Sequence, residues 1–236
     1  MPAKLGTPQE TASVDATFMD GELRGKITIP NKINGVQVLG VKNFYNQPMT
    51  HLFFIDKPED PCRIEVFATE NSIRKSLGCF AACKNLQYID LPKSLRIIGD
   101  YSFRYCISLR VEDWTKASNL QEVGQSAFSL SFVADRSPLN LVFPSSVNLI
   151  EVGAFQNFQR YANIQTITFG SQAHASRLTE NSIKTNAFSQ NSINMSAQMR
   201  IIIWCMPGLE TSLDSALDNA DGNTGIGREI NPADGE

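Results

Sequence analysis

One phenylalanine-centred pattern recurs six times along this chain and constrains its fold more than any other feature. Each phenylalanine follows a short segment of glycine, small or polar residues, as in Ile98-Gly99-Asp100-Tyr101-Ser102-Phe103. The six are Phe44, Phe80, Phe103, Phe128, Phe155 and Phe188, at intervals of 36, 23, 25, 27 and 33 residues. Self-similarity with a period of roughly 20–50 residues is typical of stacked structural repeats. The sequence therefore predicts a stack of repeating units.

A second pattern keeps a fixed distance from the first. Short runs with alternating apolar residues end in proline, as in Ile89-Asp90-Leu91-Pro92 and Leu141-Val142-Phe143-Pro144. Both prolines lie 11 residues before the next repeated phenylalanine. Proline has no backbone N–H to donate, so it ends a strand. Each unit is therefore predicted to contain a short strand followed by a turn.

The rest of the unit is predicted from glycine and cysteine positions. A glycine before the phenylalanine favours a tight turn at positive φ. Cys83 and Cys106 each lie three residues after a repeated phenylalanine, on the same face of a one-turn helix. No single unit can bury its own apolar face, so the units must stack. We expect the phenylalanines to form a buried spine, and the two cysteines to form a short ladder beside it.

These motifs resemble the BspA-like class of bacterial leucine-rich repeats, which also occurs in Treponema pallidum surface proteins. Three of the intervals fall within the roughly 20–29 residues of leucine-rich repeats. The resemblance covers roughly residues 26–206, most strongly 73–170, and residues 86–109 are close to a whole consensus repeat. The sequence departs from the pattern at Glu112-Asp113, at Trp114-Thr115 and at Lys184, which stands in a glycine position.

The resemblance implies a β-rich repeat solenoid with short helices and a curved parallel sheet on one face. It also implies binding or adhesion outside the cell, without catalysis. We expect residues 26–206 to form about six irregular repeats. Asn34-Gly35 between apolar runs indicates a hairpin that caps this solenoid over Ile27–Leu39.

The two flanks differ from the repeats in composition. Residues 1–25 form a polar arm, and residues 207–236 form a tail with seven acidic residues and one basic residue. Such a tail is predicted to be disordered by itself. Polar termini become ordered when something holds them. We therefore expect neighbouring subunits to contact both termini.

Charge and hydropathy exclude two classes of partner. The net charge of −3 lacks the dense basic patch that nucleic acid binding requires. The longest uninterrupted apolar run, Ile201–Met206, is far shorter than the roughly 20 residues of a membrane-spanning helix. The first 25 residues carry no visible signal peptide. The chain is expected neither to bind nucleic acid nor to span a membrane.

No residue pattern predicts catalysis, a cofactor or a metal. The two histidines, His51 and His174, lie far apart, and no nucleophile motif accompanies them. Five cysteines do not describe a disulfide framework and are expected to be free and buried. The segment 222–227 lacks the features of a phosphate loop, and 218–222 has the wrong residue types for a calcium loop. We therefore predict a protein that is not an enzyme.

The candidate binding surface follows from strand alternation. Residues that flank inward apolar positions must point the other way, to the outer face of the sheet. On three predicted strands these outward residues are Tyr88, Asp90, Asn140, Val142, Thr166 and Thr168. Stacked strands are expected to place them on one continuous surface. Tyr88 is the expected anchor because aromatic residues dominate interface hot spots. The alternative is a sheet face that is only solvated.

Two functions remain open from the sequence. The first is a non-catalytic leucine-rich repeat protein that binds a protein or glycan in adhesion at a bacterial surface. The second is a structural or host-recognition subunit of a phage virion, tail or tail-like assembly. The first places the chain outside the cell or on its surface, and the second places it in a particle.

Overall fold

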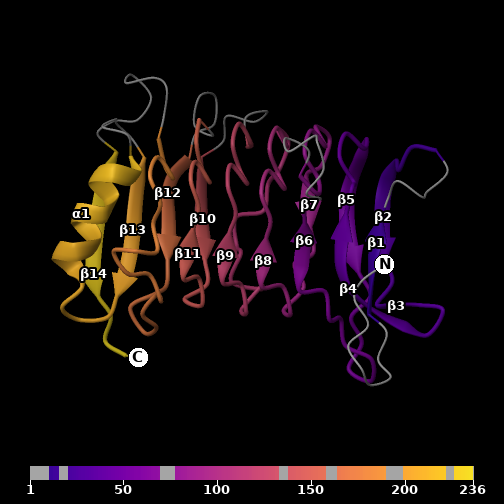
Figure 1. Cartoon of the computed structure of the whole chain (residues 1–236), viewed down its shortest axis with the longest axis horizontal. Helices are drawn as coiled ribbons and strands as arrows, with labels where there is room; N and C mark the ends of the chain where they lie inside the picture. The colour runs from indigo at the N-terminus through magenta and orange to yellow at the C-terminus, as the bar shows by residue number, and fades with distance from the viewer. Residues whose placement is uncertain are drawn as a thin grey trace.

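The computed structural model describes residues 11–15, 21–69, 78–132, 138–157, 164–189, 199–221 and 226–235. These residues form a solenoid whose coils run from the N-terminal end at the right of Figure 1 to the C-terminal end at the left. Its elements are β1 (Thr11–Asp15), β2 (Gly25–Ile29), β3 (Lys32–Ile33), β4 (Val36–Lys42), β5 (Met49–Phe54), β6 (Val66–Ala68), β7 (Tyr88–Ile89), β8 (Ile97–Ile98), β9 (Glu122–Val123), β10 (Leu139–Phe143), β11 (Leu149–Ile150), β12 (Ile164–Phe169), β13 (Arg200–Cys205), α1 (Glu210–Ala220) and β14 (Gly227–Pro232).

Parallel strands line two sides of the solenoid. One sheet has the order β1-β4-β6-β8-β9-β11, with β3 antiparallel to β4. The other side carries two sheets, β2-β5-β7 and β10-β12-β13-β14. A regular coil thus has two strands, such as β7 and β8 on either side of Pro92. Pro30 and Pro144 directly follow β2 and β10 as predicted, whereas β7 ends three residues before Pro92. The second strand of the coil, only two residues long, was not foreseen.

The predicted phenylalanine spine is confirmed. All six repeated phenylalanines are fully buried. The ring centroids of Phe80 and Phe103, Phe103 and Phe128, and Phe128 and Phe155 are each 5.3 Å apart, with interplanar angles of 19°, 11° and 9°. Phe155 and Phe188 continue the stack at 5.3 Å and 5°. The repeat interval therefore places one ring per coil on a common axis.

The segment around each phenylalanine, which we call the arc, consists of turns and not of the predicted one-turn helix. The reason is positive φ at the residues two before and two after the phenylalanine. Tyr101 and Tyr105 have φ of 56° and 61° around Phe103, and Ser126 and Leu130 have φ of 51° and 59°. A right-handed helix requires negative φ throughout. The arcs around Phe103, Phe128 and Phe155 are therefore closed by left-handed residues on both sides of the buried ring.

The glycines of the repeat serve close packing between coils. Gly99 and Gly124 do not have positive φ, so that prediction is wrong for them. A Cβ at Gly99 would lie 2.6 Å from the backbone oxygen of Phe67, and one at Gly124 would lie 2.6 Å from the backbone nitrogen of Asp100. Real side chains do not tolerate such contacts. Glycine is required here because neighbouring coils approach closely.

The predicted cysteine ladder is confirmed and continues into a serine. The thiol of Cys83 lies 2.9 Å from the carbonyl oxygen of Phe44, and that of Cys106 lies 3.1 Å from the carbonyl oxygen of Phe80. Ser131, at the same offset in the next coil, donates its hydroxyl to the carbonyl of Phe103. Each side chain satisfies a buried carbonyl of the preceding coil.

The N-terminal hairpin is present but smaller than predicted. Asn34 and Gly35 have φ of 51° and 81°, as a type I′ turn requires, and they connect β3 to β4. The preceding strand, β2, instead pairs in parallel with β5. The first strand, β1, pairs in parallel with β4. Residues 1–10 and 16–20 of the predicted arm lie outside the described residues.

The expectation that the acidic tail is disordered by itself is wrong for residues 207–221 and 226–235, whereas contact of the termini with neighbouring subunits stays a prediction. The described tail residues form α1 and β14, and β14 pairs in parallel with β13 of the same chain. The physical reason is an apolar face within the acidic sequence: Leu213, Leu217 and Ala220 recur at helical spacing and are buried. The tail is therefore the last coil of the solenoid.

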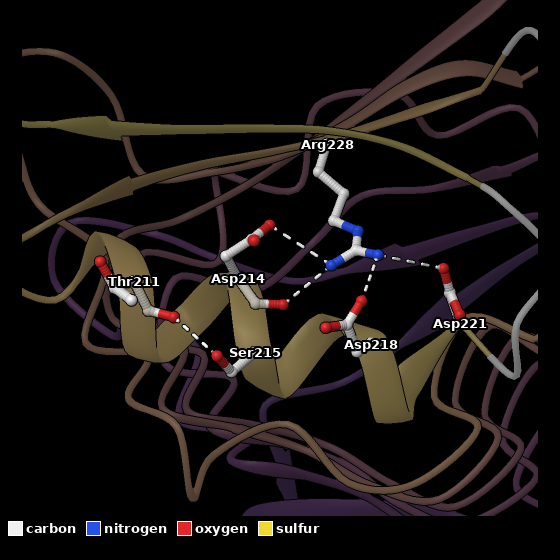
Figure 2. A network of polar contacts seen from close by, with 6 residues as sticks. All are labelled: Thr211, Asp214, Ser215, Asp218, Asp221 and Arg228. Atoms are coloured by element: carbon white, nitrogen blue, oxygen red, sulfur yellow. Dashed lines mark hydrogen bonds and ion pairs between the residues drawn. The ribbon is translucent and has the colours of Figure 1, made fainter.

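Arg228 on β14 offsets much of the acidic charge of this coil (Figure 2). Its guanidinium lies 2.5 Å from a carboxylate oxygen of Asp218, 3.3 Å from one of Asp214 and 3.7 Å from one of Asp221. It also donates to the backbone carbonyl of Asp214 at 2.9 Å. The one base that the sequence places among seven acids therefore joins the helix to the final strand.

Candidate binding surface

The predicted alternation holds on the strands that carry the candidate residues. Leu141 and Phe143 on β10, and Ile167 and Phe169 on β12, are fully buried. Between them, Asn140 is exposed, while the other outward residues are half-buried: Val142, Thr166, Thr168, Tyr88 and Asp90. Their part in binding stays a prediction. The strands that carry them, β7, β10 and β12, are labelled in Figure 1.

Four of the six candidates lie side by side. Asn140 pairs in register with Thr166, and Val142 pairs with Thr168. The hydroxyl of Thr166 donates to the side-chain oxygen of Asn140 at 2.8 Å. These polar and small apolar side chains form a fixed patch on the outer face of β10 and β12.

Tyr88 and Asp90 belong to a different sheet, so the predicted continuous sheet is divided. On this side of the solenoid, the described residues between β7 and β10 form no strand, only an isolated bridge between Asp113 and Val142. The cause is the interruption that the sequence shows at Glu112-Asp113, where both residues are exposed and Val111 turns inward. Trp114 is fully buried, and its indole nitrogen donates to the carbonyl of Val111 at 2.9 Å.

Tyr88 lies in a group of three outward rings, which we call the aromatic cluster: His51, Phe53 and Tyr88. His51 pairs in register with Tyr88 across β5 and β7. The ring centroids are 6.1 Å apart for His51 and Phe53, 6.1 Å for His51 and Tyr88, and 5.9 Å for Phe53 and Tyr88. The Tyr88 hydroxyl lies 3.5 Å from a carboxylate oxygen of Asp90. All three rings are half-buried on the outer face.

Sequence reasoning missed His51 and Phe53. The signal was present, because Leu52 and Phe54 are buried while the residues between them point outward. It was overlooked because no proline ends this strand. The sequence favours a surface or structural role for His51, and its ring nitrogen lies 3.0 Å from the hydroxyl of Thr50 while its ring packs in the cluster.

The cysteines are not placed as nucleophiles. All five are free and buried. Burial raises the pKa of Cys83 to about 12 and raises the pKa of Cys106, Cys62 and Cys205 as well. A buried thiol with a raised pKa carries little thiolate, which is the reactive form. The thiols therefore act as packing and hydrogen-bonding groups.

Other candidate motifs find structural roles or fall outside the structure. In the part of the chain that the structure describes, no three His, Cys, Asp or Glu residues are placed to hold a metal ion. Asp218 and Asp221 of the calcium-like segment pair with Arg228. Residues 222–225 of the glycine-rich segment lie outside the described residues. Among the described helices, none has the length and apolar character to cross a membrane.

Comparison with known proteins identifies the family. The model of the BspA type leucine rich repeat region matches residues 76–202 in six copies, and the chain belongs to this family. The crystal structure of the T. pallidum leucine-rich repeat protein is similar, with a TM-score of 0.51 and 18% sequence identity, over 88% of this chain and 86% of that one. At this identity the likeness concerns the fold alone. No curated protein matches the chain.

These findings confirm the predicted family and the predicted repeat solenoid. The chain is a leucine-rich repeat protein, of a family and fold that typically serve as non-enzymatic scaffolds for protein binding.

Proposed function

We propose that this chain is a non-catalytic recognition module that binds a protein partner through the outer face of β5, β7, β10 and β12, with the aromatic cluster as its anchor. The observation that carries the proposal is the mutual contact of His51, Phe53 and Tyr88 on a face that the core does not need. Extended solenoid surfaces suit binding over a large area.

The cluster has the physical properties of an interface anchor. Aromatic side chains supply large contact areas and lose little conformational entropy on binding. The three rings already restrict one another, so less freedom remains to be lost. Asp90, beside the Tyr88 hydroxyl, adds a hydrogen-bonding group at the edge of the cluster. We expect most of the binding free energy to come from these residues.

The patch on β10 and β12 has a supporting role in the proposal. Asn140 and Thr166 are hydrogen-bonded to each other, so each side chain has fewer hydrogen-bonding groups left for a partner. Val142 and Thr168 offer small apolar groups beside them. We expect these four residues to extend the contact area and to contribute less than the cluster.

A protein partner is favoured over a glycan because the family is typical of protein binding. Adhesion at a bacterial surface is the setting that the family resemblance suggests. The alternative of a virion or tail subunit rested on termini held by neighbouring chains, on free cysteines and on the lack of a visible signal peptide. The first of these grounds is weakened, because the described C-terminal residues pack on their own solenoid. We therefore favour the first function.

The test compares matched alanine variants against a partner isolated on the wild-type chain. Tyr88→Ala and Phe53→Ala are expected to weaken binding by about tenfold or more, as loss of a hot-spot side chain does. Thr166→Ala is the matched variant on the second sheet and is expected to change affinity much less. A glycan array probed with the same proteins tests the other ligand class. Unchanged affinity in a folded Tyr88→Ala/Thr166→Ala double variant would move the site elsewhere.

A further inference from the structure

A second surface lies on the arcs, on a side of the solenoid that the proposed sheet face does not include. Its centre is Arg104, whose guanidinium carbon lies 5.6 Å from the ring centroid of Tyr101 and 5.0 Å from that of Tyr105. Tyr105 is 41% exposed. The three residues belong to a single arc, around the buried Phe103.

Both tyrosines have a backbone conformation that disfavours them. Tyr101 has φ of 56° and Tyr105 has φ of 61°. A bulky side chain in this region is a steric outlier, whereas glycine and asparagine adopt it readily. At the position of Tyr105 other arcs carry Asn46, Ala82, Leu130 or Asn157, and at the position of Tyr101 others carry Ser126, Gly153 or Asn186. Among the described arcs, only this one has an aromatic residue at both positions.

The preceding coil places small residues beside this arc. Ala82 donates its backbone N–H to the carbonyl of Arg104 at 2.7 Å. Gly78 lies against the backbone of Tyr101, and its missing Cβ would lie 2.1 Å from the Tyr101 carbonyl carbon. Tyr105 is exposed at the surface, and Tyr101 and Arg104 are half-buried next to it.

Arg104 is incompletely satisfied by the described residues. Its Nε atom is buried and has no hydrogen-bond partner there. The ring faces of the tyrosines contact the cation without accepting its hydrogen bonds in the plane of the guanidinium. A guanidinium held between two rings presents its remaining N–H groups in a rigid fork that matches a carboxylate.

We infer that Tyr101, Arg104 and Tyr105 form a second binding site, which takes a segment of a partner protein that presents an Asp or Glu carboxylate. The carboxylate pairs with the terminal nitrogens of Arg104, and the tyrosine rings cover the apolar part of the segment. Tyr and Arg are the residues that interface hot spots favour. The strained tyrosines are retained because their rings hold and desolvate the cation, which strengthens its attraction for an anion.

The test uses a displayed library of random linear peptides, selected on a chain that carries Tyr88→Ala so that the aromatic cluster is weakened. Selected peptides are expected to be enriched in Asp and Glu and to lose about tenfold or more of their affinity for Arg104→Gln, as loss of a charge-assisted pair implies. Arg177→Gln removes an exposed arginine elsewhere on the solenoid and is expected to leave affinity unchanged. A selection that returns no acidic, Arg104-dependent peptide overturns the inference.

A second variant separates binding from folding. Tyr105→Asn places a residue suited to positive φ at this position. It is expected to leave the melting temperature unchanged or higher while weakening the selected peptides. A lower melting temperature would show that Tyr105 serves the fold, and it would overturn the claim that the strain is retained for binding. Because the selection background already lacks Tyr88, failure here leaves the proposed sheet-face function standing.

Discussion

The middle coils, residues 78–132 and 138–157, and the last coil, residues 199–221 and 226–235, are stabilised in different ways. In the middle, each coil has a neighbour on both sides, and one phenylalanine ring per coil stacks on the next. At the end, α1 replaces the arc: its C-terminal carbonyls at Asn219 and Ala220 accept hydrogen bonds from Asn186 and Phe188. A repeat pattern in the sequence therefore identifies the coils that pack between two other coils. The last coil is identified instead by the apolar spacing of an amphipathic helix.

The largest expected effect lies in the middle. Phe103 contacts the rings of Phe80 and Phe128 and is fully buried. Phe103→Ala is expected to lower the free energy of unfolding by ~3–5 kcal/mol, because a large cavity opens between two coils. Urea unfolding followed by circular dichroism measures this. A variant as stable as the parent would contradict the stacked register.

The matching change in the cap is Leu217→Ala. Leu217 is fully buried on the inner face of α1. Its loss is expected to cost ~2–5 kcal/mol, as for other buried leucines, but to loosen mainly the last coil. Hydrogen exchange should therefore increase at α1 and β14 before it increases at the middle coils. Ser215→Ala, at an exposed position of the same helix, is the control and is expected to change little. Equal loosening along the whole chain would show that the cap does not unfold separately.

The cysteine ladder gives a smaller effect that distinguishes packing from hydrogen bonding. Cys106→Val keeps an apolar side chain but removes the thiol donor to the carbonyl of Phe80, which still accepts from the backbone N–H of Cys83. The change is therefore expected to cost ~0.5–1.5 kcal/mol, the net contribution of an ordinary hydrogen bond. Cys106→Ser restores a donor, as Ser131 provides in the next coil, and should cost less. If serine proves the more disruptive of the two in thermal unfolding, the carbonyl contact is not what the position requires.

The smallest expected effect concerns Glu122 on β9, which pairs in register with Ile97 and Leu149. Burial, and then Glu151 and Asp100, raise the pKa of this carboxyl. Since the folded-state pKa is above the unfolded value, ionisation of Glu122 disfavours folding as pH rises through this range. Glu122→Gln is expected to be more stable than the wild type at neutral pH, by less than about 1 kcal/mol because the group is half-exposed. The difference should vanish at pH values below the unfolded-state pKa, and a gain that persists there would have another cause.

Repeated residues made much of the fold predictable. The offset from Pro144 to Phe155 correctly placed the end of β10 and a buried ring. The second strand, Ile97–Ile98, has only two residues, too few to show an alternation. The positive φ of Tyr101 and Tyr105 could not be predicted either, because tyrosine rarely adopts it.

The candidate site was predictable only within single strands. Alternation correctly oriented Asn140 and Thr166. The sequence also shows the interruption at Glu112-Asp113, but alternation within single strands does not tell whether neighbouring strands pair into one sheet. The contact of His51 with Tyr88 depends on pairing between strands 37 residues apart, which one sequence does not specify. In the tail, acidic residues hid the apolar spacing of Leu213 and Leu217.

The central claim, that one solenoid extends to the end of the chain, is tested most directly by hydrogen exchange on the monomeric protein. Light scattering first verifies that the protein is monomeric. The account predicts slow exchange at β13 and β14. It also predicts slow exchange at the backbone amides of Phe188 and Ala233, which donate hydrogen bonds to the carbonyls of Ala220 and Cys205. Exchange of these amides at the rate of an unstructured chain, while the middle coils stay protected, would contradict it.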